Sequence, residues 1–386
     1  MRVFRACLVA VVATLAPGVR AQPAAPVPPA PADTAPHEFI DDAKALLVVG
    51  ACAEGTAPIK AEVYEAHCKK IRAAQQDYKA KWLVPAGEFF HANVPANIPK
   101  TVVYPFAGGD LATALTVFPD ADEITTISLE PAGDPRALTR LGDKRLRAPL
   151  AIVETELSSL YRYNYSKTMN MIDAMRVGQL PTQLIFSLSA LATHDYEPTA
   201  MRYFELTPDG DIRYLTDTDL TKLDKIKDPR KLNTALSNVE LRFRKPGGRE
   251  QVYRHIMANL EDAHLKKAPA VLNHLIKKGR VSAMTKAASY LLTFNEFKTM
   301  RTYLADHVDW MVSDSTGLPP AQGTAAGFEY ETWGTYEVSN MKEGASVTPS
   351  WKKLYAAQPK RPLAFRFGYP DAKLHNHLII MRKPAS

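Results

Sequence analysis

Hydrophobic positions along the chain follow helical spacing in some segments and strand spacing in others. In the helical segments, apolar residues recur every three or four positions among charged ones. In the strand-like segments, short apolar runs stop at glycine, proline or polar turn residues. The predicted helices are 39–49, 59–82, 134–141, 150–175, 182–194, 268–279 and 295–307, with one more directly after Gly109.

Two β-hairpins are predicted in the middle of the chain, around the glycine-containing turns TPDGD and RKPGGR. In the second hairpin Val239, Leu241 and Phe243 alternate with charged residues, which is the pattern of a strand with one buried face. Strand-like runs also occur at 308–312, 363–369 and 377–383, whereas 281–292 fits a helix or a strand and 328–336 is typical of an aromatic loop. Alternating β and α elements predict an α/β fold with a mixed sheet.

The first residues have the pattern of an export signal. A basic start with Arg2 and Arg5, an apolar stretch and small residues before Gln22 predict a signal peptide over residues 1–21; an uncleaved membrane anchor is the alternative. Residues 22–36 form a Pro/Ala-rich linker, 37–100 an N-terminal helical segment, and 101–386 the α/β domain. We therefore expect a periplasmic or secreted protein without a transmembrane segment in its mature chain.

Charge and cysteine content agree with that compartment. The formal charge of the full chain is +7. Residues 1–21 contain three arginines and no acids, so their removal leaves a charge of 7 − 3 = +4, which does not point to nucleic-acid binding. Cys52 and Cys68 are then the two remaining cysteines, and an exported chain most simply joins them in a disulfide. A redox or metal pair near His67 is the less favoured interpretation, because the spacing is not that of a CxxC motif.

The stretch TVVYPFAGGDLATALTVFPDADEITTISLEP, residues 101–131, carries the first candidate site. Gly108 and Gly109 let the backbone approach a ligand beside Phe106, and Asp110 stands where the N-cap of the next helix belongs. Glu130 ends the second strand, where an acid accepts hydrogen bonds from ribose hydroxyls. The alternative is a tight strand-to-helix turn with its cap and no ligand.

The second candidate site is the SDSTG segment after the run 308–312. If this strand is parallel to the one that starts at Thr101, Asp314 and Asp110 face one crevice, flanked by Ser313 and Ser315. Asp110, Glu130 and Asp314 are the predicted catalytic carboxylates, and such a group is able to bind a divalent cation or share acid/base work. A turn capped by its own side chains is the alternative.

The stretch 101–131 resembles the first β-α-β unit of Rossmann-like methyltransferases, including its FPDAD turn. The chain also resembles an uncharacterised family of secreted bacterial proteins, through the segment Tyr-Pro-Phe-small-Gly-x-Asp, KAASYLL and WMVSDSTGLPP. These resemblances imply a Rossmann-like mixed sheet with helices on both faces, elaborated by β-hairpins and an N-terminal helical pair.

Two functions follow as hypotheses. The first is binding or hydrolysis of a small polar ligand, containing phosphate or sugar, at the carboxyl ends of the strands. The second is a non-catalytic cell-envelope or interaction protein on a degenerate methyltransferase-like scaffold. The cofactor is unknown; a divalent cation is compatible with the carboxylates, whereas S-adenosylmethionine and NAD are not expected for an exported protein. A basic group on the second hairpin, including Arg242, Arg249 and Arg254, indicates either an anion-binding patch or, as we favour, a solvated strand face.

Overall fold

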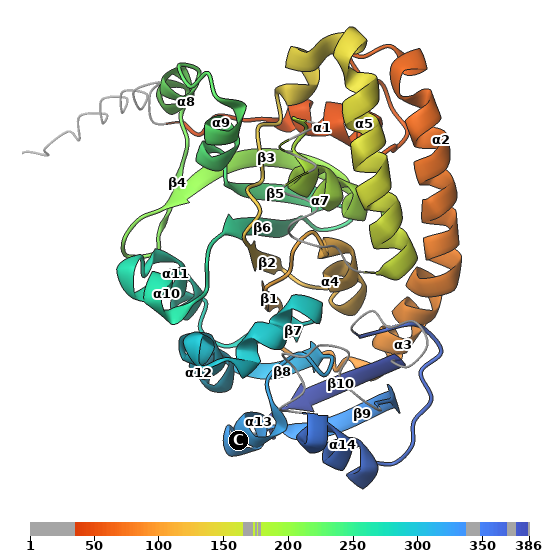
Figure 1. Cartoon of the computed structure of the whole chain (residues 1–386), viewed down its shortest axis with the longest axis vertical. Coiled ribbons are helices and arrows are strands. Elements are labelled where there is room, and N and C mark those ends of the chain that lie inside the picture. The colour runs from red at the N-terminus through yellow and green to blue at the C-terminus, as the bar shows by residue number, and fades with distance from the viewer. Residues whose placement is uncertain are drawn as a thin grey trace, which may run out of the picture.

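A computed structural model describes residues 35–164, 173, 176, 179–336, 348–368 and 376–384. The predicted signal peptide and most of the linker lie outside these residues. The described chain forms an α/β fold around a ten-stranded mixed sheet with the order β4-β3-β5-β6-β2-β1-β7-β8-β10-β9 (Figure 1). The strands are β1 (Thr101–Pro105), β2 (Glu123–Ser128), β3 (Glu197–Leu206), β4 (Ile212–Tyr214), β5 (Asn238–Arg244), β6 (Gln251–Met257), β7 (Val281–Thr285), β8 (Val308–Ser313), β9 (Glu329–Thr335) and β10 (Asn376–Arg382).

The middle of the sheet is parallel and its two edges are antiparallel. Strands β6, β2, β1, β7 and β8 pair in parallel. The hairpin partners β5, β3 and β4 extend one edge, and β10 and β9 extend the other. Both predicted hairpins, β3–β4 and β5–β6, are confirmed. Because all five central strands run the same way, their carboxyl ends meet at one side of the sheet.

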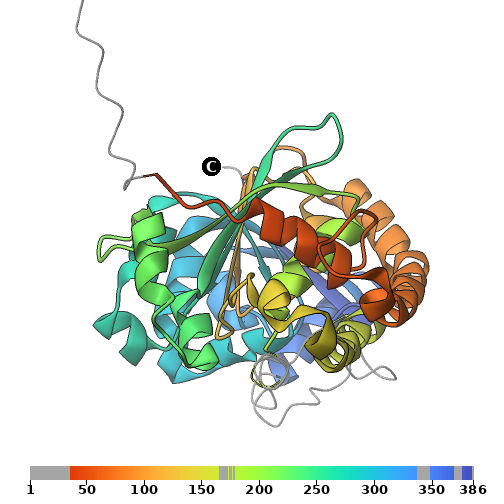
Figure 2. The same ribbon diagram turned by 90° about the horizontal axis from the view of Figure 1, so that it is seen from above.

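Helices cover both faces of the sheet, as Figure 2 shows for α1, α2 and α5 on one side and α10–α12 on the other. Their bounds are α1 (Ile40–Val49), α2 (Ala61–Tyr78), α3 (Val84–Asn93), α4 (Leu111–Val117), α5 (Ala137–Tyr163), α7 (Thr182–Thr193), α8 (Asp217–Leu223), α9 (Pro229–Ala235), α10 (Asp262–Lys267), α11 (Ala270–Lys277), α12 (Lys298–His307), α13 (Pro320–Ala325) and α14 (Thr348–Ala357).

Alternation along the central strands separates two hydrophobic cores. Val102 and Tyr104 face the helices that precede β3, whereas Val103 packs with the helices of the second half. Successive side chains of a strand point to opposite faces, so one short run supplies both cores. A strand buried on both faces has no polar side of its own, which agrees with the near-continuous apolar character of β1.

The N-terminal helical pair is clamped as predicted. Cys52 and Cys68 form a disulfide, with their Cα atoms 5.1 Å apart, and this bond joins the loop after α1 to α2. The second predicted helix continues beyond the predicted end at residue 82, through a π-helical turn at Lys79–Leu83 into α3. The helical pair is therefore longer and more firmly tied to the sheet domain than the pattern indicated.

Other boundaries differ from the predictions. The helix expected at 134–141 and the first part of the one expected at 150–175 belong to one element, α5, which breaks at Gly142 (φ 62°) and contains Pro149 in its interior. Most of the predicted helix beyond residue 164 lies outside the described residues. The predicted aromatic loop 328–336 is largely strand β9, and 363–368 is not a strand. The ambiguous segment 281–292 is β7 followed by a 3₁₀ helix at Ala287–Thr293.

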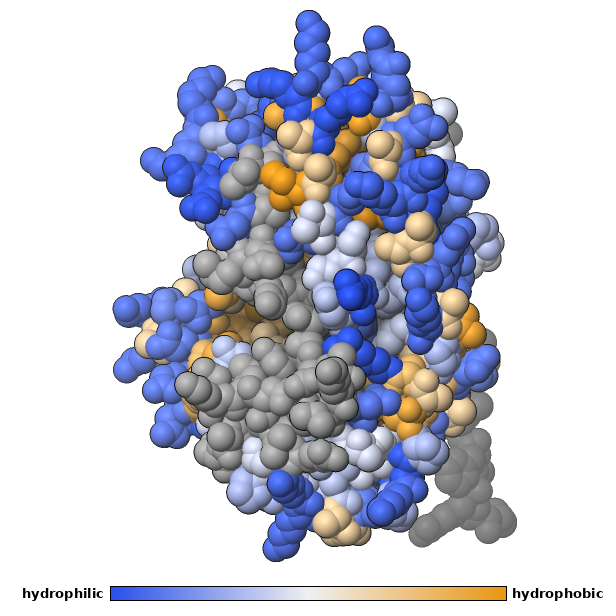
Figure 3. All heavy atoms as spheres, turned by 45° about the vertical axis from the view of Figure 1, so that its right-hand side comes forward, coloured by the Kyte–Doolittle hydropathy of each residue, from blue (hydrophilic) through white to orange (hydrophobic). Residues whose placement is uncertain are grey.

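Hydrophilic residues predominate among the coloured residues on the face drawn in Figure 3. On the face drawn in Figure 3, hydrophobic residues lie in small groups between hydrophilic ones. Among the large apolar side chains, Val84, Leu129 and Ile276 are the exposed ones within the described ranges. No helix in these ranges has the length and apolar character needed to cross a membrane.

Candidate functional site

The candidate site lies where the direction of the strand order changes. From β1 the chain passes through α4 to β2 on one side, whereas β7 and β8 lie on the other side of β1. In open α/β sheets ligands bind beyond the carboxyl ends of the strands at this switch point. The turn after β1 has two residues in the left-handed region, Phe106 (φ 59°) and Gly108 (φ 55°), and both are half-buried.

Asp110 caps α4 and is almost fully buried at 3% exposure. Its Oδ1 accepts from the backbone N–H of Thr113 at 3.3 Å and from the Thr113 hydroxyl at 2.6 Å. Its Oδ2 accepts from the Tyr104 hydroxyl at 3.1 Å and from Lys286 Nζ at 2.7 Å. The predicted N-cap is confirmed, and the Asp110 carboxylate occupies the start of α4, where free N–H groups would otherwise attract an anionic ligand.

Lys286 is the member of this site that sequence reasoning missed. It follows β7, is 2% exposed, and donates from Nζ to Asp110 and, at 3.0 Å, to the Thr113 hydroxyl. Its ammonium also lies 5.7 Å from the centre of the Phe367 ring. The signal available in the sequence was its place as the first residue of KAASYLL. A buried ammonium needs a partner, and Asp110 supplies the opposite charge.

Asp314 follows β8 and is fully buried. One carboxylate oxygen accepts from the backbone N–H of Ala287 at 3.1 Å, and the other accepts from the backbone N–H of Thr316 at 2.8 Å and from the Thr316 hydroxyl. Burial raises the pKa of Asp314, and these hydrogen bonds oppose the shift. The carboxylate thus organises its own turn.

The two serines beside Asp314 also serve local contacts. Ser313 accepts from the Thr285 hydroxyl at 2.8 Å and donates to the Asp314 carbonyl at 2.7 Å. Ser315 is half-buried and hydrogen-bonds with Tyr336. The expected parallel relation of β8 to β1 holds, with β7 between them.

The three sequence segments that carried the resemblance to secreted proteins meet at this point. The first supplies Tyr104 and Asp110, the second Lys286 and Ala287, and the third Asp314. The Lys286–Asp110 ion pair and the Ala287–Asp314 hydrogen bond join them across β1, β7 and β8. Every carboxylate oxygen of Asp110 and Asp314 has a donor within the chain.

Glu130 differs from these two acids. It lies two residues beyond β2 and is fully buried, and neither carboxylate oxygen has a hydrogen-bond partner within the described chain. Its backbone carbonyl accepts from His255 Nε2 at 2.7 Å. Burial lowers the pKa of His255 to about 4, so the ring is neutral and its Nδ1 acts as an acceptor at pH 7.

Gln183 connects this acid to the glycine turn. Its amide nitrogen donates to His255 Nδ1 at 3.2 Å and to the Gly108 carbonyl at 3.3 Å. Its Oε1 is buried and, like the Glu130 oxygens, has no donor in the described residues. Glu130, just beyond β2, and Gln183 of α7 both hydrogen-bond with His255 of β6, and their side chains leave three buried acceptor oxygens unpaired among the described residues.

A metal-binding constellation of the predicted acids is not formed. Among the described residues, the one group of three ligand types within reach of a shared ion is Cys52, His67 and Cys68. Its two sulfurs are joined in the disulfide, and His67 Nε2 is 3.0 Å from the Gly50 carbonyl. The disulfide interpretation is confirmed over the metal one.

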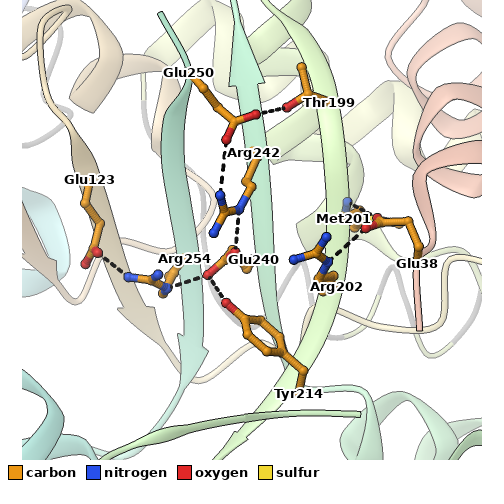
Figure 4. A network of polar contacts seen from close by, with 10 residues as sticks. All are labelled: Glu38, Glu123, Thr199, Met201, Arg202, Tyr214, Glu240, Arg242, Glu250 and Arg254. Carbon is orange, nitrogen blue, oxygen red and sulfur yellow. Dashed lines mark hydrogen bonds and ion pairs between the residues drawn. The ribbon is translucent and has the colours of Figure 1, made fainter. Parts of the chain in front are cut away.

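The basic residues of the second hairpin are paired with acids. Figure 4 shows Glu240, 1% exposed, between Arg242 and Arg254, with the Tyr214 hydroxyl as a third donor. Arg254 also contacts Glu123, and Arg249 contacts Asp122. We expected Glu240 on a solvated face, but it is buried because β4 and β6 bring these partners over it. The pairing favours a structural role for this face.

Comparisons with known protein families, with curated proteins and with solved structures found no match. The geometry described above is therefore the basis for a functional conclusion.

Proposed function

We propose that the protein binds a small polyhydroxylated ligand, a sugar or a ribose-containing compound, over the carboxyl ends of β1 and β2. The observation that carries this proposal is the buried Glu130 carboxylate, for which the described part of the chain supplies no hydrogen-bond donor. Burying an ionised carboxylate without donors costs several kcal/mol, and native proteins rarely retain such a group without a use for it. Ligand hydroxyl groups supply the missing donors.

The order of the parallel strands supports this placement. Numbered along the chain, the five central strands lie in the order 3-2-1-4-5, which is the order of doubly wound nucleotide-binding sheets. In such sheets an acid at the end of the second strand accepts from ribose hydroxyls, and Glu130 occupies that position. Gly108, half-buried and with positive φ, permits close approach of a ligand to the backbone beside it.

The geometry favours binding over hydrolysis. Asp110 and Asp314 have their oxygens engaged by backbone, hydroxyl and ammonium donors, so neither is free to act as a base. The start of α4 already holds the Asp110 carboxylate, which disfavours a phosphate at that point. The ligand is therefore inferred to be recognised through hydroxyl groups.

A non-catalytic envelope or interaction protein on a degenerate methyltransferase-like scaffold is the second candidate. The buried Lys286–Asp110 pair favours it, because it closes the switch point between β1 and β7 with the protein's own side chains. For either function we propose that the protein acts outside the cytoplasm, in the periplasm or as a secreted protein. The Cys52–Cys68 disulfide supports this location, since such bonds persist in oxidising compartments.

Isothermal titration calorimetry with adenosine, 2′-deoxyadenosine, ribose and glucose, each with and without Ca²⁺ or Mg²⁺, tests the first candidate. We expect at least one hydroxyl-rich compound to bind and Glu130→Gln to weaken it about 10- to 150-fold, the equivalent of a hydrogen bond to a charged group. Asp314→Asn is the matched control, because both oxygens of that carboxylate already have donors within the chain, from Ala287 and Thr316. The Kd of this variant should equal that of the wild type.

Stability of the unliganded protein provides an independent readout. If Glu130 is kept for a ligand, Glu130→Gln leaves the free energy of unfolding unchanged or raises it, whereas Asp314→Asn lowers it. A wild-type protein that binds none of the compounds, together with a destabilised Glu130→Gln variant, argues for the non-catalytic scaffold.

A further inference from the structure

A cavity beside α2 and the end of α5 has the features of a binding site separate from the one at Glu130. It has a volume of about 470 Å³, and its walls include Tyr78, Trp82, Tyr161, Arg162, Asn164 and Arg366. We call it the Trp82 cavity. Its volume falls within the usual range of small-molecule sites.

Aromatic rings form the apolar wall of the Trp82 cavity. Tyr78 and Trp82 stack with their ring centres 5.2 Å apart and an interplanar angle of 15°, and Tyr161 lies 5.3 Å from Tyr78. Hydrogen bonds hold two of the rings in place: the Trp82 indole donates to the Arg366 carbonyl at 2.6 Å, and the Tyr161 hydroxyl contacts Ser189. Rigid rings of this kind bind flat apolar groups at a low cost in conformational entropy.

Two residues of the cavity, Arg366 and Asn164, have donor atoms without an acceptor in the described chain. Arg366 Nε and Nη2 are buried, and neither has a hydrogen-bond partner in the described chain. Asn164, 5% exposed, likewise has an unpaired Nδ2, although its Oδ1 accepts from Thr113 at 3.2 Å and from Tyr78 at 3.5 Å. The Asn164 oxygen therefore has donors, whereas three nitrogen donors, Nε and Nη2 of Arg366 and Nδ2 of Asn164, remain unpaired in the described chain.

The identity of the two arginine atoms indicates the ligand. Nε and Nη2 form one edge of the guanidinium, and that edge matches the two oxygens of a carboxylate in a bidentate pair. Within the described residues neither Arg366 nor Arg162 has a carboxylate within ion-pair distance, so both leave a positive charge at the cavity. The lining also contains Asp77 and Lys81, which pair with each other at 2.6 Å. Side-chain rotation on binding is common, so the edge needs only to turn toward the cavity.

We propose that the Trp82 cavity binds a small carboxylate with an aromatic or flat apolar body. The carboxylate pairs with Arg366 and Asn164, and the body packs against Tyr78 and Trp82. The site is distinct from the one at Glu130, since it lies among α2, the end of α5 and the segment around Arg366. Asn164 connects the cavity to the Asp110 network, because the Thr113 hydroxyl lies within hydrogen-bond distance of both Asn164 and Asp110.

Titration calorimetry with indole-3-acetate, and with its uncharged isostere indole-3-acetamide, tests the proposal on the full chain. We expect saturable binding of the acid and at least tenfold weaker binding of the amide. Arg366→Lys keeps the charge but loses the bidentate edge, and Arg366→Gln loses both, so the Kd should rise at least tenfold in each. Arg361→Lys is the matched control, because Arg361 lies in the same segment but faces Glu331 and Trp333.

Several outcomes would overturn the proposal: no saturable binding of the acid, equal affinity for acid and amide, or an unchanged Kd in both Arg366 variants. The acid and amide comparison uses the wild-type protein, so it decides the question even if the variants fail to fold. Glu130→Gln should leave the Kd for indole-3-acetate unchanged, which separates failure of this site from failure of the proposed sugar site.

Discussion

Replacing Lys286 by methionine tests whether the ion pair at the switch point stabilises the fold. The side chains of Lys286 and Asp110 are 1% and 4% exposed, and their charged atoms are 2.7 Å apart. Methionine keeps most of the volume of the lysine stem but removes the ammonium. Asp110 then retains the Tyr104 and Thr113 donors and loses its only countercharge among the described residues.

The expected cost follows from burial. Removing one partner of a buried ion pair leaves an uncompensated charge and typically costs about 3–5 kcal/mol, whereas an exposed pair contributes about 0–1 kcal/mol. Lys70→Met is the matched control, because Lys70 pairs with Glu154 at a similar 2.8 Å but is 68% exposed. We therefore expect a large loss for Lys286→Met and almost none for Lys70→Met.

Urea unfolding followed by circular dichroism measures both effects. Asp110→Asn and the double variant Lys286→Met/Asp110→Asn complete a double-mutant cycle, and the double variant should cost clearly less than the sum of the single ones. If Lys286→Met costs under about 1 kcal/mol, or if the two single effects add within about 0.5 kcal/mol, the pair does not stabilise the fold as argued.

Three further predictions concern stability. Burial raises the pKa of Glu123, but two neighbouring cations outweigh it and hold the pKa at about 2 instead of 4.5. Glu123→Gln should therefore cost up to about 3 kcal/mol at pH 7, and its difference from wild type should vanish as the pH falls from 4.5 to 2 in urea titrations. The disulfide closes a loop of 16 residues, so Cys52→Ala/Cys68→Ala should cost about 3 kcal/mol and lower the Tm by about 4 °C in calorimetry. Gly317→Ala places a Cβ 1.9 and 2.5 Å from two hydroxyl oxygens and should cost about 1–3 kcal/mol in urea unfolding.

Each of these predictions has a control. Glu205→Gln breaks an ion pair in which both side chains are about half exposed. Its free energy of unfolding should differ little from that of the wild type at any pH in the same titration. Dithiothreitol should lower the Tm of the wild type but not of the double alanine variant; equal sensitivity contradicts the disulfide argument. Gly87→Ala lies in α3 with no atom within 4 Å of the added Cβ, and should stabilise by about 0.5–1 kcal/mol. A Gly317→Ala variant as stable as Gly87→Ala contradicts the steric argument.

Local sequence patterns determined much of the fold. The strand–turn–helix stretch from Thr101, the N-cap at Asp110, both hairpins and the disulfide were predicted, because each depends on residues close together in the chain or on very few candidates. The errors arose where local patterns are ambiguous. Aromatic residues at 328–336 suit a loop or a strand, and the pattern divides α5 between 141 and 150, whereas the helix breaks at Gly142.

The site depended on tertiary structure. Hydrophobic spacing indicates which side of a strand is buried, but it does not specify which strand lies beside it. Placement of β7 between β1 and β8 brought Lys286 to Asp110, and placement of β6 beside β2 brought His255 under Glu130. The sequence by itself therefore selected Asp110 and Glu130 as candidates. Only the packed structure showed that Asp110 is satisfied and that Glu130 is not, since hydrogen-bond satisfaction depends on neighbours distant in the chain.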